Sequence, residues 1–445
     1  MKHFFKMVAV LLFAICIMGN VFAGGGGQAS SSAKPGARSV SIMVGAPTNP
    51  EDTELGEKFY RGPIQAAFPN DNVSFIEWTD RQSIQIQVAG GGGPDILDID
   101  GPTDANEFAK AGRVIALDDY ARKYNWSSQF FEWAYNSGIY QGKLYSVPNS
   151  FEGMVMYYNM DVLNKFNLKI PTTAAELIEI CQFFQRNGII PISFGNSNYQ
   201  GAVDWLYSMW TSCYAGPPKV RDVLTGKTTW HDPLLTESWQ QMVDWWQAGY
   251  IGDRKSQAIT NADMVALFAN GQAAMMVDGT WATSELLNVY PSCNWVIDLM
   301  PELRPGVGRF FPIATGGALC VNSASRYQDF AAEVLNWILI GSKDRHIASV
   351  REANWQPYPL KYFTKDSFAG MDLRMVNMYD ILMNAQNTGN TGYCSWTFYP
   401  SDLRVFMNDN TDALFLNRMS VRDFLARCQE ITEAAIRDGT VPPIH

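Results

Sequence analysis

The hydrophobic positions in the first hundred residues form short apolar runs that alternate with amphipathic segments. The runs VSIMV (40–44), VSFIEW (73–78) and DILDI (95–99) have the length and composition of buried strands. Between them, residues 50–68 and 81–89 place apolar side chains at helical spacing. Alternation of strands and helices at this spacing predicts a parallel sheet with crossover helices, so the fold class is α/β.

Polar residues cluster at the end of the third predicted strand. Asp98, Asp100 and nearby Asp104 lie there, and ligands of open α/β sheets bind at the carboxyl ends of the strands. We therefore expect Asp100 at a ligand site. The preceding GGGGP (90–94) predicts a tight turn rather than a phosphate loop, because no Lys-Ser/Thr pair follows and the next element is a strand.

A second α/β block begins near Tyr145. Residues 144–163 predict an approach strand, a proline-marked turn and a buried strand, and residues 171–177 predict a helix start with a Thr cap and an acidic first turn. Further helices carry large apolar residues three and four positions apart, which is typical of core packing: Trp205, Leu206, Met209, Trp210, Trp239, Val243 and Trp246.

Composition bounds the size of the core and the class of partner. With 445 residues, 47% of them hydrophobic, the chain can form two domains, and its 14 Trp, 19 Tyr and 25 Phe leave some rings to line a ligand surface. The formal net charge is -10, which disfavours nucleic acid and anionic membranes as partners.

The N-terminus has the order of a secretory signal peptide. Two lysines, an apolar run over 7–18 and the small residues of Val21-Phe22-Ala23 predict a signal peptide over residues 1–23, cleaved after Ala23 and leaving a net charge of -12. A lipid anchor at Cys16 is disfavoured, because Ile15 replaces the small residue of a lipobox. Residues 24–38, rich in Gly and Ser, predict a flexible tether. We expect an exported, periplasmic or extracellular protein.

The remaining cysteines and the histidines do not define a catalytic or metal site. Export permits disulfides, yet no C-x-x-C pair occurs, so buried thiols and disulfide bridges both remain open for six cysteines: Cys181, Cys213, Cys293, Cys320, Cys394 and Cys428. Four scattered histidines and the absence of a G-x-S-x-G motif argue against zinc and serine-hydrolase chemistry. We expect no metal and no cofactor.

Four motifs in a fixed order resemble a known family. The segments GGPDILDIDG (92–101), YSVPNSFEGMVMYYNMDVL (145–163) with PTTAAEL (171–177), LFANGQAAMMVDGTWATSEL (267–286) and PIATGGALCVNSAS (312–325) resemble the family 1 extracellular solute-binding proteins of ABC importers, among which are binders of maltose and other sugars. The resemblance extends over most of the chain beyond Ser39.

The resemblance implies a two-lobed, type II periplasmic-binding-protein fold, with the ligand cleft between lobes joined by a multi-strand hinge. It implies an N-terminal lobe of residues 39–149 plus 315–355 and a C-terminal lobe of residues 150–314 plus 356–445. Glycines and prolines lie at the implied crossings, which suits a hinge.

A sugar site needs hydroxyl-bonding polar groups beside aromatic rings. The resemblance implies Trp281 as a stacking ring and Glu152 as a cleft carboxylate, and it places an acid at Asp100, although Ile99 stands where the family presents an aromatic residue. Packing of Trp281 within its own lobe and a solvated Glu152 are the alternatives. The remaining candidates are Asn198 and Tyr199 near Asn196, Trp396 and Tyr399 in an aromatic loop, Gly317 beside Gly316, and Asn49.

The resemblance implies capture of a sugar or oligosaccharide by a monomer that closes on its ligand and delivers it to the permease subunits of an ABC importer. A secreted glycosidase using Glu152 and Asp100 as its two carboxylates is the rival. A ferric-ion binder would need clustered tyrosines, but Tyr157 and Tyr158 alternate in orientation on a strand. A structural surface protein would have no closing cleft.

Overall fold

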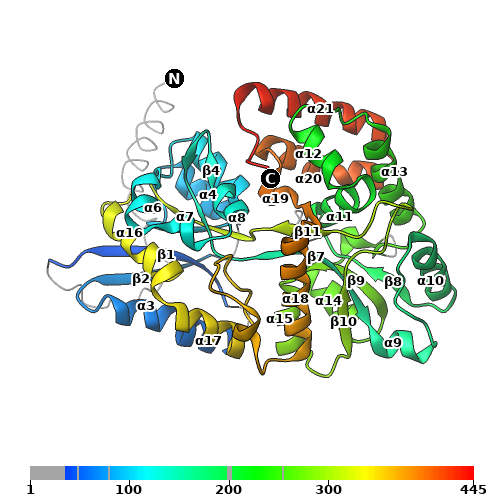
Figure 1. Ribbon diagram of the computed structural model, residues 1–445, viewed down its shortest axis with the longest axis horizontal. Coiled ribbons are helices and arrows are strands. Elements are labelled where there is room, and N and C mark those ends of the chain that lie inside the picture. The colour runs from blue at the N-terminus through cyan, green and yellow to red at the C-terminus, as the bar shows by residue number, and fades with distance from the viewer. Residues whose placement is uncertain (1–35, 48–49, 79–80, 198–202, 253–254, 445) are drawn as a thin grey trace, which may run out of the picture.

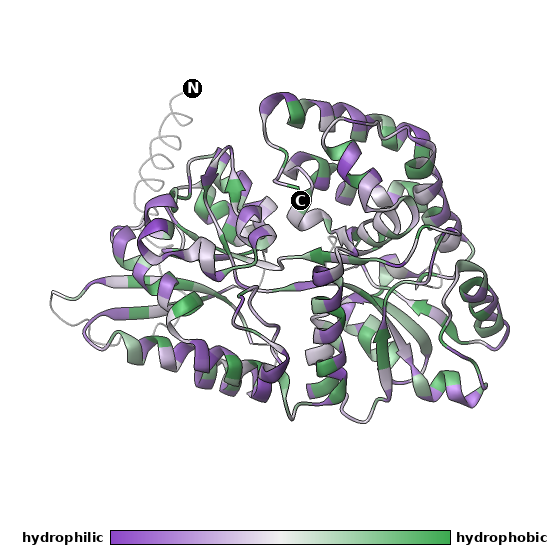
Figure 2. Cartoon of the chain, viewed as in Figure 1, coloured by the Kyte–Doolittle hydropathy of each residue, from purple (hydrophilic) through white to green (hydrophobic). Residues whose placement is uncertain are grey.

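The structure, a computed structural model, describes residues 36–47, 50–78, 81–197, 203–252 and 255–444. Two α/β lobes lie side by side, each built around one main sheet (Figure 1). Hydrophobic residues concentrate on the central strands and hydrophilic residues on the outer helices (Figure 2). The predicted α/β class and two-lobed fold are confirmed, whereas the predicted signal peptide lies outside the described residues.

The first lobe is organised by a five-stranded sheet. Its first three strands pair in parallel, as their spacing in the sequence predicts, and a strand from much later in the chain joins them antiparallel, with Gly317 opposite Asp100. The strand order is β2 (Asn72–Trp78), β1 (Ser39–Gly45), β3 (Ile96–Asp100), β12 (Gly317–Val321) and β6 (Val147–Pro148).

Helices cover both faces of this sheet, and two apolar clusters fill the space between. They are α2 (Pro50–Gly56), α3 (Gly62–Ala67), α4 (Arg81–Ala89), α5 (Pro102–Lys110), α6 (Asp118–Tyr124), α7 (Trp126–Gln129), α8 (Glu132–Ser137), α16 (Gln328–Asn336) and α17 (Lys343–Ala353). A short hairpin of β4 (Ile139–Tyr140) and β5 (Lys143–Leu144) completes the lobe.

The second lobe has a six-stranded mixed sheet. Its central strands are buried along their whole length, which explains why EGMVMYYN and AAMMVDG are almost continuously apolar. The order is β13 (Thr391–Tyr393), β11 (Phe311–Ala314), β7 (Glu152–Asn159), β9 (Ala273–Gly279) and β8 (Ile190–Ser193), and β10 (Trp295–Asp298) also pairs with β7.

The helices of this lobe pack on the largest apolar cluster of the molecule. They are α9 (Met160–Lys165), α10 (Ala174–Arg186), α11 (Val203–Trp210), α12 (Pro217–Leu224), α13 (Pro233–Gln247), α14 (Asn261–Ala269), α15 (Ala282–Asn288), α18 (Leu373–Thr388), α19 (Ser395–Phe398), α20 (Ser401–Phe415) and α21 (Val421–Asp438). The predicted Thr cap of α10 is confirmed, because Thr173 and Glu176 form a capping box.

The chain passes between the sheets more than once. It leaves the first sheet at Pro148 and enters the second at Glu152, and it returns between Ala314 and Gly317. Beyond α17, Leu360, Phe363 and Phe368 pack in the first lobe's core, and α18 then contributes to both cores. In Figure 1, α18 lies at the boundary between the lobes.

Two segments near the N-terminal end of the described chain differ from the sequence prediction. The single helix predicted over 50–68 is interrupted by a π turn at Glu57–Arg61, closed by the Gly62 N–H donating to the Glu57 carbonyl. Arg38, assigned above to the flexible tether, forms ion pairs with Asp71 at 2.7 Å and Glu333 at 2.9 Å, so ordered structure includes it.

The described cysteines are all buried and free, so buried thiols are the form present. Within the described ranges, none of the helices combines the length and apolar character needed to cross a bilayer.

Candidate functional site

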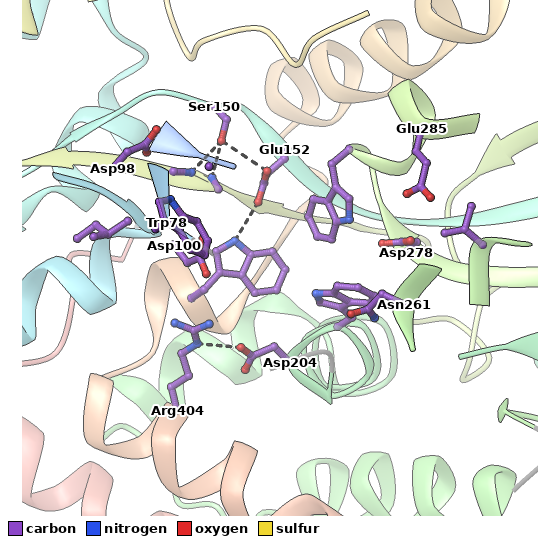
Figure 3. Close-up of a pocket in the computed structure, with 18 residues that line it drawn as sticks. Trp78, Asp98, Asp100, Ser150, Glu152, Asp204, Asn261, Asp278, Glu285 and Arg404 are labelled. Atoms are coloured by element: carbon purple, nitrogen blue, oxygen red, sulfur yellow. Dashed lines mark hydrogen bonds and ion pairs between the residues drawn. The ribbon is translucent and has the colours of Figure 1, made fainter. Parts of the chain in front are cut away.

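A cavity of about 540 Å³ lies where the two lobes face each other. Its size falls within the range of small-molecule sites. Strand ends of both sheets and helices of the second lobe supply its walls, as Figure 3 shows for the labelled residues. The first lobe contributes Gly45, Trp78, Asp98, Ile99, Asp100, Gly316 and Gly317, and the rest of the lining comprises Ser150, Glu152, Asp204, Trp205, Asn261, Val265, Asp278, Trp281, Glu285, Trp396 and Arg404.

Glu152 lies at the start of β7, where the chain enters the second sheet. Its side chain is only 8% exposed, so it is not the solvated residue of the alternative interpretation. Trp396 Nε1 donates a hydrogen bond of 3.2 Å to its Oε1 atom, and burial raises the pKa of Glu152 to about 8. Near neutral pH the side chain therefore carries a proton and can both donate and accept hydrogen bonds.

The side chains of Glu152 and Asn149 lie directly against two glycines. A Cβ atom on Gly316 would lie 1.9 Å from Glu152 Oε2, and one on Gly317 would lie 2.0 Å from Asn149 Oδ1. Both contacts are far shorter than van der Waals distance. A side chain at Gly316 or Gly317 would therefore displace the Glu152 carboxyl or the Asn149 amide where β11 passes into β12, and Gly317 itself lines the cavity.

Asp98 and Asp100 face the cavity from the end of β3. They share one face of the strand because side chains alternate along it. Asn149 Nδ2 donates a hydrogen bond of 2.9 Å to Asp98 Oδ1, yet burial dominates and raises the pKa of Asp98 to about 7. The polar cluster predicted at this strand end is thus part of the cavity wall.

Trp281 supplies a ring surface on the opposite side. Its indole lies 5.4 Å from that of Trp205 and 6.0 Å from that of Trp396, measured between ring centroids. A Cβ atom on Gly279 would lie 2.1 Å from the Trp281 ring, so the ring rests directly on the end of β9. The D-G-T-W turn therefore sets the position of an indole at the cavity.

The buried carboxyl of Asp278 belongs to the same turn. It is 2% exposed, and its Oδ1 atom accepts a hydrogen bond of 2.7 Å from the Gly279 N–H. Burial raises the pKa of Asp278 well above its ordinary value, and the nearby carboxyls of Glu285 and Glu152 act in the same direction. The cavity wall here is polar without carrying its full formal charge.

An ion network joins the lobes at the cavity floor. Arg404 of α20 donates to Asp204 of α11 at 2.8 Å and to Asp104 of α5 at 3.1 Å, and Arg404 is only 4% exposed. Since α5 follows β3 of the first sheet, Arg404 bridges the two lobes. Sequence reasoning named Asp104 but missed Asp204 and Arg404, because ordinary helical positions give no motif.

The structure brings five predicted site residues together at the cavity: Asp100, Glu152, Trp281, Gly317 and Trp396. Tyr399 is not among the lining residues, because its ring is fully buried and stacks on Tyr207 in the core. The segment around Trp396 and Tyr399 is not the exposed loop we expected but the buried one-turn helix α19 and its end. Asn49, Asn198 and Tyr199 lie outside the described residues.

Several lining residues had no clear signal in the sequence. Trp205 was assigned to the core by its helical spacing, yet it also reaches the cavity, and Trp78 does so from the end of β2. Asp278 and Glu285 flank Trp281 in the motif that carried the resemblance, so that motif is the signal that could have found them. Tyr157 and Tyr158 are both fully buried in the core of the second lobe and are not among the residues that line the cavity.

Two facing α/β lobes with a polar and aromatic cavity between them define the class of two-lobed binding proteins. Residues 52–339 match the family described as bacterial extracellular solute-binding protein. This match spans more than half of the chain, so the protein belongs to that family, whose members are binding proteins.

Curated relatives are similar over part of the chain. A probable sugar-binding periplasmic protein of Rhizobium meliloti (strain 1021) is 30% identical over 143 residues, which are 28% of this chain and 33% of the relative. The glucose-binding protein GlcS of Saccharolobus solfataricus is 25% identical over 196 residues, 40% of this chain and 34% of the relative. The chain thus matches about a third of the length of each of these relatives.

Solved structures share the fold over nearly the whole chain. A chitin oligosaccharide binding protein superposes with a TM-score of 0.76 at 19% identity, covering 90% of this chain and 99% of the other. Maltose-bound MalE3 of T. maritima superposes with a TM-score of 0.71 at 21% identity, covering 89% and 100%. At these sequence identities, the structural similarity establishes the fold of this chain and nothing beyond the fold.

Proposed function

We propose that this protein captures a sugar or oligosaccharide in the cavity between its lobes and delivers it to an ABC importer. The observation that carries the proposal is the pairing of indole rings with buried, hydrogen-bonding carboxyls around one interlobe cavity. Ring faces pack against the C–H faces of a sugar, and carboxyls bond its hydroxyl groups. The names of the relatives and of the structural neighbours support the same ligand class.

Each lobe provides half of the proposed site. Asp100 and Gly317 stand on the first sheet, Glu152 stands on the second, and Trp281 lies two residues beyond strand β9 of the second. A ligand that contacts both halves stabilises the closed arrangement, because only that arrangement offers both sets of contacts. In this proposal the membrane partner recognises the closed protein through surfaces on both lobes.

The remaining parts of the proposal concern location and assembly. The protein acts as a monomer outside the cytoplasm, after removal of the signal peptide over residues 1–23, and its partners are the permease subunits of the importer. The proposed lobes comprise residues 39–149 plus 315–355 and residues 150–314 plus 356–445, except that Leu360, Phe363 and Phe368 pack in the core of the first lobe before α18 begins.

A titration of intrinsic tryptophan fluorescence with a panel of sugars tests this function. Trp78, Trp205, Trp281 and Trp396 line the cavity, so a bound sugar should shift the emission saturably without being consumed. Product analysis of the same mixtures separates the alternatives. Release of reducing sugar would indicate a glycosidase, and a flat response to every sugar would contradict the proposal.

A further inference from the structure

The cavity is lined by far more acidic than basic side chains. Arg404 is the cation among the described lining residues, and it already bonds Asp204 and Asp104. Six carboxyl side chains line the same cavity: Asp98, Asp100, Glu152, Asp204, Asp278 and Glu285. A neutral ligand would add nothing to balance this surplus of acid.

Neighbouring carboxyls act on three of these acids, Asp98, Glu152 and Asp278. Apart from burial, which is the largest cause in each case, Asp100 raises the pKa of Asp98 and of Glu152, and Glu285 and Glu152 raise that of Asp278. In the described part of the chain, the groups that lower these pKa values are neutral hydrogen-bond donors such as Asn149, Trp396 and the Gly279 N–H.

The acids do not stand alone, because indole rings line the same cavity. A protonated amine is attracted by the face of an indole as well as by a carboxylate, and the C–H faces of a sugar pack on the same rings. A sugar bearing an amine therefore satisfies both features of the wall at once. A neutral sugar satisfies the rings but brings no positive charge to Glu152, Asp278 and Glu285.

We propose that the cavity takes a carbohydrate carrying a protonated amine, an amino sugar or its oligomer. This inference rests on the proposed function, whose ligand class it narrows. The amine is placed beside Asp278, Glu285 and Glu152, because these three carboxyls line the cavity together with Trp281. Figure 3 shows Asp278 and Glu285 together on one side of the cavity, with Glu152 facing it from the middle.

Three β-1,4-linked disaccharides that differ only at C2 provide the first test. The glucosamine disaccharide carries an ammonium group there, N,N′-diacetylchitobiose an acetamide and cellobiose a hydroxyl. Isothermal titration calorimetry should give a Kd for the ammonium form that is lower by about tenfold or more than for the other two. Added salt should narrow this difference, because it screens charge.

The variant Glu285→Gln tests the placement of the amine. It keeps the shape of the side chain and removes its charge, so the ammonium disaccharide should lose on the order of tenfold in affinity. The neutral compounds should change little. Glu179→Gln is the matched control, since Glu179 is exposed on α10 of the same lobe and away from the cavity lining.

Sugars with other ring configurations are tested with monosaccharides of the galacto and manno series. Each series is measured with an amine, an N-acetyl amine or a hydroxyl group at C2. If no amine in any series binds more tightly than its neutral counterparts, the inference is wrong while sugar capture stands. If spermidine binds and no sugar does, both the inference and the proposed function fail. A Glu285→Gln variant that keeps full affinity for the ammonium form overturns the placement and with it the inference.

Discussion

At the scale of single residues, the proposed site depends most on Trp281, whose ring rests on the end of β9 and is only partly buried. Trp281→Ala removes this ring face from the cavity, and we expect an affinity loss of about 30-fold, equivalent to about 2 kcal/mol. Fluorescence or calorimetric titration measures it. Trp337→Ala is the control, since that partly buried indole packs on Phe68 in the first lobe and should affect stability alone.

Glu152 links the site to pH through its buried carboxyl. Its pKa is about 8 in the folded protein, against an ordinary value of 4.5. Between these pH values the folded state holds a proton that the unfolded state has lost, so this group makes the free energy of unfolding fall as pH rises. Below pH 4.5 both states are protonated and the effect vanishes.

Glu152→Gln removes that dependence, because glutamine stays neutral and still accepts the hydrogen bond from Trp396. We expect the variant to exceed the wild type in stability by on the order of 3 kcal/mol at pH 7.5 and to match it at pH 4.5. Urea unfolding at several pH values measures this difference. A difference that stays constant with pH, as expected for the exposed control Glu179→Gln, would contradict the assigned protonation state.

The sequence was informative about those site residues that follow directly from strand ends and motifs. Asp100 could be placed because the parallel-strand pattern locates the carboxyl edge of a sheet. Arg404 could not, since its role depends on α20 packing against α5 and α11, a contact between segments 200 to 300 residues apart. Tyr399 was misplaced because its turn-like neighbours in the sequence do not show that Tyr207 of α11 and Trp230 pack against its ring.

At the scale of elements, strand and helix types were predictable but their interruptions were not. The apolar runs located β1, β2 and β3 to within a residue or two. The π turn within residues 50–67 was invisible, because helical periodicity looks the same on either side of it. Gly62 is the residue in the sequence that is tied to the π turn, because a Cβ atom at this position would approach the Glu57 carbonyl oxygen to 2.8 Å.

The end of β9 offers a test of how one element positions the site. Gly279→Ala would place a methyl group 2.1 Å from the Trp281 ring, so the ring must move and the aromatic wall of the cavity with it. We expect the fold to persist with a loss in affinity of about tenfold or more. Gly56→Ala is the control, since a Cβ atom there meets no atom within 4 Å. Equal ligand affinities for the two variants would contradict a role of the Gly279 turn in positioning the site.

At the scale of the whole molecule, the two lobes meet through ionic contacts of two kinds along α5 and α20. The buried kind is Arg404 with Asp104 and Asp204, and the exposed kind is Lys110 with Asp402 at 3.7 Å. The two kinds of ion pair should contribute very differently to the free energy of unfolding. Exposed pairs contribute little because water and salt screen them, whereas removing one partner of a buried pair leaves an uncompensated charge.

Arg404→Met should therefore destabilise the protein by about 3 kcal/mol, because two largely buried carboxylates of different lobes lose their shared cation. Lys110→Met removes a cation between the same two helices at the surface, and we expect a loss of about 0.5 kcal/mol or less. Urea unfolding of both variants in parallel measures the difference. Losses of equal size would show that the arginine is not the main ionic link between the lobes, and the cavity floor would then depend on apolar packing alone.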